Sequence, residues 1–135
     1  MSKKIKKVLV IEDSPISQQL NEKLLIRDGY QVIEAFDGEM GIRLAKSERP
    51  DAILLDIILP DMDGKNVAYA LSEDDTTKSI PIIFTTNTLD PKKDKGNEVI
   101  EVHGKSYRAF AKPLHNNKLL SVLRKEINKR IYNNI

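Results

Sequence analysis

The sequence has no cysteine and no tryptophan among its 135 residues, and only seven aromatic residues in all. Without cysteine there is no disulfide-stabilised scaffold, no zinc site built on thiolates and no cysteine nucleophile. So few aromatic side chains leave few platforms on which nucleic-acid bases can stack. Long hydrophobic runs are also missing, since Ala52–Leu55 is far shorter than a membrane span. We expect a soluble, cytoplasmic protein without membrane insertion.

The net charge of +2 gives little support to nucleic-acid binding. It comes from 22 basic and 20 acidic residues, and four of the lysines lie within the first seven positions. Nucleic-acid binding relies on clustered neutralisation of phosphates, so we expect no direct nucleic-acid contact and interpret the basic start as a solvated strand edge. Only four apolar residues separate these lysines from Glu12, too few for a signal peptide.

Two kinds of sequence segment alternate along the chain. Short β-branched apolar segments, typical of strands, lie at 8–11, 31–35, 52–57, 80–85 and 107–111. Longer segments with helical spacing separate them. Parallel neighbouring strands need crossover connections, and the expected crossovers are helical. The alternation therefore predicts an α/β fold: a doubly wound, three-layer sandwich around a five-stranded parallel sheet, in one domain.

The sequence indicates some of the expected helices more clearly than others. The first begins after the N-cap Ser14, shows helical spacing at Ile16 and Leu20, and ends at Gly29. The last carries an apolar stripe from Leu119 to Ile131. The stretch 87–104 holds a proline, a glycine and a lysine cluster with few apolar anchors, and predicts only a short or broken helix.

Polar residues follow four of the five predicted strands directly. Glu12 and Asp13 end the first strand, Asp56 the third, Thr86 the fourth and Lys112 the fifth. Ligands of doubly wound sheets bind beyond the carboxyl ends of the strands. If the first and third strands are neighbours, three carboxylates converge there and need a cation to offset their repulsion. Oxygen ligands alone favour Mg²⁺.

Each of these residues also has an ordinary structural interpretation. An aspartate after a strand often serves as a cap or turn residue, and Lys112 is compatible with a surface lysine. The segment from Asp61 to Gly64 is compatible with an acidic turn in which the glycine has a positive φ. The shared position of the polar residues at one end of four predicted strands favours a functional site, because unrelated polar residues would fall at both ends of the strands.

Four segments together resemble the receiver domains of two-component response regulators, of the CheY-like type. They are VLVIEDS at 8–14, LLDIILPDMDG at 54–64, PIIFTT at 81–86 and Lys112-Pro113. The resemblance extends over roughly Lys6 to Arg130. It implies a flavodoxin-like strand order of 2-1-3-4-5 and a single receiver domain over 1–135 with no output domain.

The resemblance also implies roles for the residues at the strand ends. Asp56 would be the phosphoacceptor, and Thr86 (or its neighbour Thr85) and Lys112 would bind phosphoryl oxygens. A Mg²⁺ ion would be held by Glu12, Asp13, Asp56 and the backbone carbonyl of Ile58. A sensor histidine kinase or histidine phosphotransferase would donate the phosphoryl group, and an unknown protein would be the downstream target. The protein would modify only itself and lose the group slowly, and so would not be an enzyme.

The sequence departs from the family pattern at several positions. Asn87 replaces the usual small residue after the threonine, and Ala109 stands where a switch aromatic is usual. Phe110 shares the strand parity of Lys112 and is expected to pack inside. The partner surface formed by the fourth helix, fifth strand and fifth helix is therefore expected to be remodelled. The apolar Ile58 should hinder an attacking water, which predicts a long-lived phosphoryl group.

Other functions remain open at this stage. The chain is compatible with the N-terminal receiver of a longer regulator, in which residues 128–135 begin a linker helix. A phosphatase of the haloacid-dehalogenase type would need an Asp-x-Asp motif where this chain has Glu12-Asp13. A flavodoxin would need a phosphate-binding loop that residues 14–17 do not provide. These absences leave the enzyme and electron-carrier alternatives remote.

Overall fold

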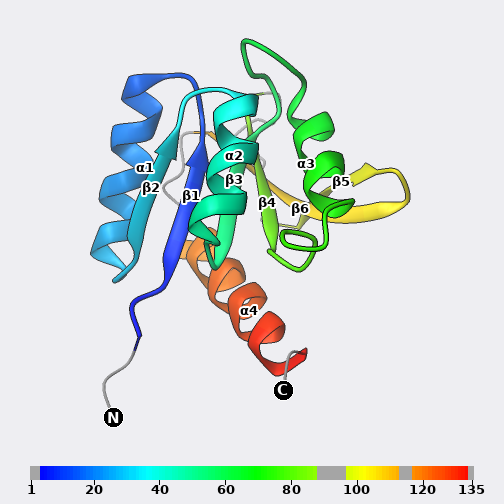
Figure 1. The fold of residues 1–135 in the computed structure, drawn as a ribbon. Helices are drawn as coiled ribbons and strands as arrows, with labels where there is room; N and C mark the ends of the chain where they lie inside the picture. The colour runs from blue at the N-terminus through cyan, green and yellow to red at the C-terminus, as the bar shows by residue number, and fades with distance from the viewer. Residues whose placement is uncertain (1–3, 88–96, 113–116, 134–135) are drawn as a thin grey trace.

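The computed structural model describes residues 4–87, 97–112 and 117–133. The strands of one mixed sheet are β1 (Lys7–Ile11), β2 (Gln31–Ala35), β3 (Ala52–Asp56), β4 (Ile82–Thr86), β5 (Glu98–Val102) and β6 (Lys105–Ala111). Their spatial order is β2-β1-β3-β4-β6-β5. The helices are α1 (Pro15–Arg27), α2 (Gly38–Glu48), α3 (Gly64–Ser72) and α4 (Asn117–Asn133). Figure 1 shows these helices packed on both faces of the sheet.

Two apolar layers hold the sandwich together. The first lies between the sheet and helices α2 and α3, and includes Leu9, Leu55 and Phe84. The second lies between the opposite face of the sheet and helices α1 and α4, and includes Val10, Leu54 and Leu123. Every residue of β3 and β4 is buried. The continuous apolar runs of the central strands are therefore explained by helices on both sides.

Polar side chains fix where the helices begin. The Oγ atom of Ser14 accepts a hydrogen bond from the backbone of Ser17 (3.3 Å) at the start of α1. Asp37 accepts from Met40 (2.7 Å) at the start of α2, and Asp63 caps α3 in the same way. These caps satisfy amide groups that have no partner inside the helix. They also set the position of the loops that carry the candidate site.

The prediction of five parallel strands needs one correction. Strands β1, β2, β3, β4 and β6 are parallel and follow the expected order, but β5 is a sixth strand that pairs with β6 in the antiparallel sense. The prediction of a short or broken helix is wrong for residues 98–102, and residues 88–96 lie outside the described part of the chain. His103 and Gly104, with φ of 48° and 83°, form the two-residue turn between β5 and β6. Positive φ at both positions is typical of a tight hairpin turn.

The aromatic residues before Lys112 are buried in the sheet. Phe110 packs in the layer beneath α1 and α4, as the parity of the strand predicted. Tyr107 lies on the other face, edge-to-face with Phe84 at a ring-centroid distance of 5.5 Å. Ala109 is fully buried between these positions. Within the described ranges, no helix has the length and apolar character needed to cross a membrane.

Candidate functional site

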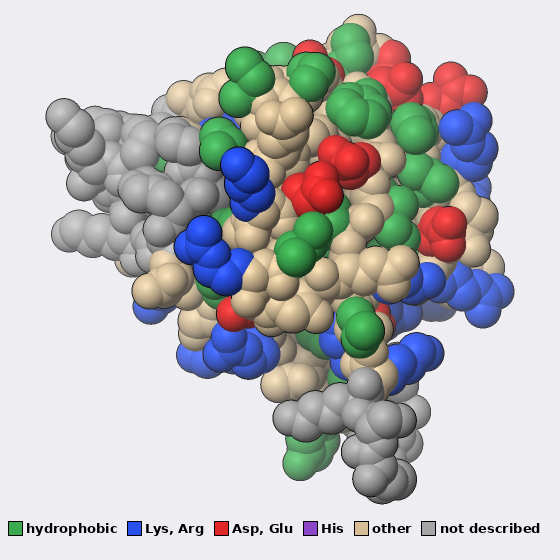
Figure 2. Space-filling model, turned by 90° about the vertical axis from the view of Figure 1, so that its left-hand side faces the viewer, with side chains coloured by type: hydrophobic (Ala, Val, Ile, Leu, Met, Phe, Trp, Pro, Cys, Tyr) green, Lys and Arg blue, Asp and Glu red, His purple; other side chains and the backbone are tan. Residues whose placement is uncertain are grey.

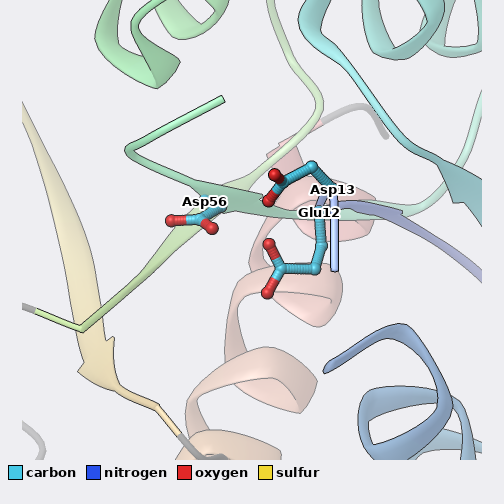
Figure 3. A group of neighbouring side chains, drawn as sticks. All are labelled: Glu12, Asp13 and Asp56. Carbon is cyan, nitrogen blue, oxygen red and sulfur yellow. The ribbon is translucent and has the colours of Figure 1, made fainter. Parts of the chain in front are cut away.

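Three carboxylates meet at the carboxyl ends of the neighbouring strands β1 and β3. Glu12 and Asp13 directly follow β1, and Asp56 ends β3. One carboxylate oxygen from each residue lies within 4.8 Å of the other two. Figure 3 shows the three side chains turned toward a common space. Glu12 and Asp56 are buried, whereas Asp13 is exposed, so the cluster opens to solvent on one side.

Lys112 joins the buried carboxylates from the end of β6. Its Nζ atom lies 2.6 Å from Oε1 of Glu12 and 2.8 Å from Oδ2 of Asp56. Its backbone N–H donates to the carbonyl of Thr86 (2.9 Å), which fixes the end of β6 against β4. The remaining Asp56 oxygen, Oδ1, accepts a hydrogen bond from the N–H of Ile58 (3.2 Å). A single ammonium group therefore offsets part of the negative charge of two acids.

Burial changes the acidity of this cluster. It raises the pKa of Glu12 to about 7, and the neighbouring Asp56 carboxyl adds to the effect while Lys112 opposes it. Burial by itself lowers the pKa of Lys112, but the hydrogen bonds that its ammonium donates to Asp56 and Glu12 outweigh that effect and leave this pKa above its ordinary value. Lys112 is thus held as a cation, and Glu12 is poised to gain or lose a proton near neutral pH.

One oxygen of this cluster has no protein partner. Among the described residues, four buried side-chain nitrogen or oxygen atoms have no hydrogen-bond partner, and Oε2 of Glu12 is one of them. An unpaired buried carboxylate oxygen is costly, and a divalent cation bound to it would remove that cost. The donors available here are all oxygens, which suits Mg²⁺ better than zinc or other softer metals. The residues present therefore fit the predicted ion.

The two threonines at the end of β4 occupy different positions relative to Asp56. In the register between β3 and β4, Thr85 lies opposite Asp56, and Thr86 lies one residue further toward the rim of the sheet. Both are buried. Thr86 pairs with Ala111, the residue before Lys112. The fold thus brings Thr86 and Lys112 to the same rim as the carboxylates.

Gln18 supports the site in a way that the sequence analysis missed. Its buried Nε2 lies within hydrogen-bonding distance of the carbonyls of Val10 (2.9 Å), Glu12 (3.1 Å) and Ala35 (2.9 Å). It therefore ties α1 to the ends of β1 and β2 and positions the backbone of Glu12. Its signal in the sequence is a polar residue four positions after the N-cap Ser14, which places it on the inner side of the first turns.

The apolar stripe that marks α1 in the sequence does not face the core over its first turns. Ile16 is 71% exposed and Leu20 is 47% exposed, whereas Gln18, Asn21 and Leu25 form the buried side. The spacing predicted the helix correctly but not the side that it buries. Ile16 and Leu20 are consequently left on the surface, as is Ile26 near the end of the helix.

The acidic segment after β3 contains a helix cap and a close backbone approach. The Asp61 carboxylate accepts hydrogen bonds from the N–H groups of Gly38 (2.8 Å) and Glu39 (2.9 Å) at the start of α2. These bonds hold the pKa of Asp61 below its ordinary value. Gly64 does not have the positive φ of the turn interpretation. It is required because a Cβ there would overlap the backbone carbonyl of Asp56.

Comparison with known proteins agrees with this fold. Residues 8–124 match the family described as the response regulator receiver domain. Protein PilH from Pseudomonas aeruginosa is 36% identical over 89 residues, covering 66% of this chain and 73% of PilH. Response regulator PleD from Caulobacter vibrioides is 37% identical over 89 residues, which are 66% of this chain and 19% of PleD.

A solved structure shows the same architecture with a metal in place. It is the receiver domain of the sensor histidine kinase PA1611 from Pseudomonas aeruginosa, described with a magnesium ion coordinated in its active site cleft. It superposes with a TM-score of 0.77 and 27% identity, covering 93% of this chain and 99% of that domain. This chain and the PA1611 receiver domain share a flavodoxin-like α/β sandwich. The chain described here belongs to the response regulator receiver domain family of two-component systems.

Proposed function

We propose that the protein accepts a phosphoryl group on Asp56, with Mg²⁺ bound by Glu12, Asp13 and Asp56. The observation that carries this proposal is the arrangement around Asp56: an ammonium 2.8 Å from one of its oxygens, and two further carboxylates within reach of one ion. The unpaired Oε2 of Glu12 supports the same ion site. We assign the backbone carbonyl of Ile58 as a further ligand because its loop begins directly at Asp56.

For phosphoryl transfer to Asp56, the protein mainly has to position the reactants and neutralise their negative charge. One oxygen of Asp56 forms a bond to phosphorus while the bond between phosphorus and the imidazole nitrogen of a phosphohistidine breaks. The bonding electrons remain on the imidazole, which takes up a proton. Mg²⁺, when bound, neutralises charge on the phosphoryl oxygens. Lys112 keeps its hydrogen bond to Asp56, and its positive charge stabilises the negative charge of the incoming phosphoryl group.

Thr86 is proposed to respond once Asp56 is modified. The phosphoryl group adds roughly 1.5 to 2 negative charges and new acceptor oxygens at the rim. A nearby hydroxyl that donates to one of these oxygens would bias the end of β4 toward a second position. In this chain the end of β4 is tied to β6 through the hydrogen bond from Lys112 to Thr86. A shift of Thr86 would therefore be passed to β6.

The surface beside Asp56 suits docking of a phosphodonor protein. Ile16, Leu20, Phe36 and Ile58 are between 41% and 71% exposed, and all lie on elements near the carboxyl rim of the sheet. Figure 2 shows hydrophobic side chains gathered over the upper part of one face of the molecule, next to acidic ones. Exposed apolar side chains grouped in this way mark interaction sites. We propose a sensor histidine kinase or a histidine phosphotransferase as the partner.

The direct test is phosphorylation of the isolated chain by a small donor. The parent, incubated with phosphoramidate and Mg²⁺, should gain about 80 Da by intact mass spectrometry, the mass of one phosphoryl group. Asp56→Asn should gain nothing, whereas Asp75→Asn, which changes an exposed carboxylate elsewhere, should behave like the parent. Equal labelling of the parent and Asp56→Asn would overturn the assignment.

A further inference from the structure

A cleft of about 480 Å³ lies at the amino ends of β4 and β6, the ends of these strands opposite Thr86 and Lys112. The last turns of α4 form its other wall. Five basic residues line this basic cleft: Lys78, Lys105, Arg108, Lys129 and Arg130. Among the described residues that line it, Glu126 is the one acidic residue. The cleft plays no part in the phosphoryl site.

The antiparallel hairpin creates this cleft. Val99 of β5 lies opposite Arg108 of β6 in the register of the hairpin. Arg108 shares its strand parity with Phe110, so the pair lies on the sheet face that α1 and α4 cover elsewhere. Val99 is 55% exposed, which shows that helix α4 does not cover this corner of the sheet. The widened sheet therefore leaves an apolar floor beside the end of α4.

One of the five positive charges is already paired with a carboxylate, because the Nζ of Lys78 lies 2.9 Å from Oδ1 of Asp75. In the described part of the chain, Lys105, Lys129 and Arg130 have no carboxylate within ion-pair distance. The Nη1 of Arg130 donates to the backbone carbonyl of Pro50 (3.3 Å), and the Nζ of Lys105 lies 5.2 Å from the centre of the Tyr107 ring. A chain with a net charge of only +2 thus concentrates one sign of charge in one concavity. Such a site attracts anionic groups and focuses their approach.

We propose that the basic cleft binds an acidic peptide segment of a partner protein. Carboxylates of the segment would contact the basic rim, and an apolar side chain between them would pack on Val99, which is 55% exposed at the floor. The apolar floor favours a peptide over a nucleic acid. The aromatic ring that borders the cleft, Tyr107, is only 5% exposed and offers no face on which a base can stack.

The test uses a fluorescein-labelled peptide that repeats Glu-Glu-Leu four times, titrated against the full chain by fluorescence anisotropy. The variant Lys105→Glu/Lys129→Glu reverses two exposed rim charges and should weaken binding by about tenfold or more. The control Lys23→Glu/Arg43→Glu makes the same change in net charge at exposed sites on α1 and α2, and should bind like the parent. Equal weakening by both double variants would overturn the proposal, because the peptide would then sense only net charge.

Two further arms separate the alternatives. Val99→Asp should weaken peptide binding without loss of the fold by circular dichroism, and unchanged binding would contradict the role of the floor. A labelled single-stranded DNA of similar charge should bind more weakly than the peptide; tighter binding that Lys105→Glu/Lys129→Glu abolishes would replace the peptide by a nucleic acid. Asp56→Asn should bind the peptide like the parent. Failure of the phosphorylation test would therefore leave this proposal standing.

Discussion

The Nζ atom of Lys112 lies 2.6 Å from Oε1 of Glu12, although one hundred residues separate the two along the chain. Glu12 directly follows β1, and Lys112 directly follows β6, which lies three positions further across the sheet. The lysine also reaches Asp56, at the end of β3 between them. This bridge holds three strand ends together and sets the electrostatics of the site.

We predict that Mg²⁺ stabilises the protein through Asp13. An ion that binds only the folded chain raises the melting temperature by mass action. The Asp13→Asn variant should lose most of that increase, since the exposed carboxylate completes the cluster. Thermal unfolding with and without Mg²⁺ measures the effect, with Asp75→Asn as the control. An unchanged increase in Asp13→Asn would place the ion elsewhere.

The metal-free protein should lose stability as the pH rises through the range in which Glu12 titrates. With a folded-state pKa of about 7 against an ordinary value of 4.5, the folded chain binds more protons than the unfolded chain between these values. The contribution of this group to the unfolding free energy therefore falls from about pH 4.5 to about pH 7 and stays low above it.

The Glu12→Gln variant isolates this contribution. Relative to the parent, this variant should be more stable at pH 8 than at pH 5, with a larger free energy of unfolding. Urea denaturation in the presence of a chelator measures this difference. Glu98→Gln, at an exposed position of β5, is the control and should not show this trend. A difference between variant and parent that does not change with pH would contradict the raised pKa.

Phosphoryl-Asp56 should persist because of Ile58. This side chain is 65% exposed, and its N–H is bonded to Asp56, so an apolar group stands at the entrance where water approaches. Ile58→Asn should shorten the lifetime several-fold, since an amide can orient a water. Intact mass followed over time after removal of the donor measures both lifetimes. Loss of the group from the parent within seconds in Mg²⁺ buffer would refute the prediction.

Gln18→Leu should destabilise the fold by roughly 1–3 kcal/mol, because it removes the hydrogen bonds that the buried Gln18 amide donates to backbone carbonyls. Gln19→Leu changes the neighbouring exposed glutamine and should cost far less. Urea unfolding of both variants at neutral pH compares them. Similar losses in the two variants would show that the three carbonyl contacts of Gln18 contribute little.

The tight turn and the edge strand explain where sequence reasoning failed. The segment 98–102 is rich in β-branched residues, which favour a strand, but the expectation of a helix between parallel strands obscured this signal. The turn at His103-Gly104 then places β5 antiparallel to β6. In α1, helical spacing at Ile16 and Leu20 indicated the helix but not its buried side, because Gln18 can be buried only where three carbonyls accept its hydrogen bonds.

The order of residues along the chain determined the parallel core and the kinds of side chain at the strand ends, because apolar periodicity and strand-terminal polar residues are local properties. Only the tertiary structure decided that Glu12, Asp56 and Lys112 touch, that Oε2 of Glu12 lacks a partner, and that a cleft opens beside the hairpin. These features depend on which strands become neighbours and on what each helix leaves uncovered. They arise from packing between segments far apart in sequence, which no local pattern records.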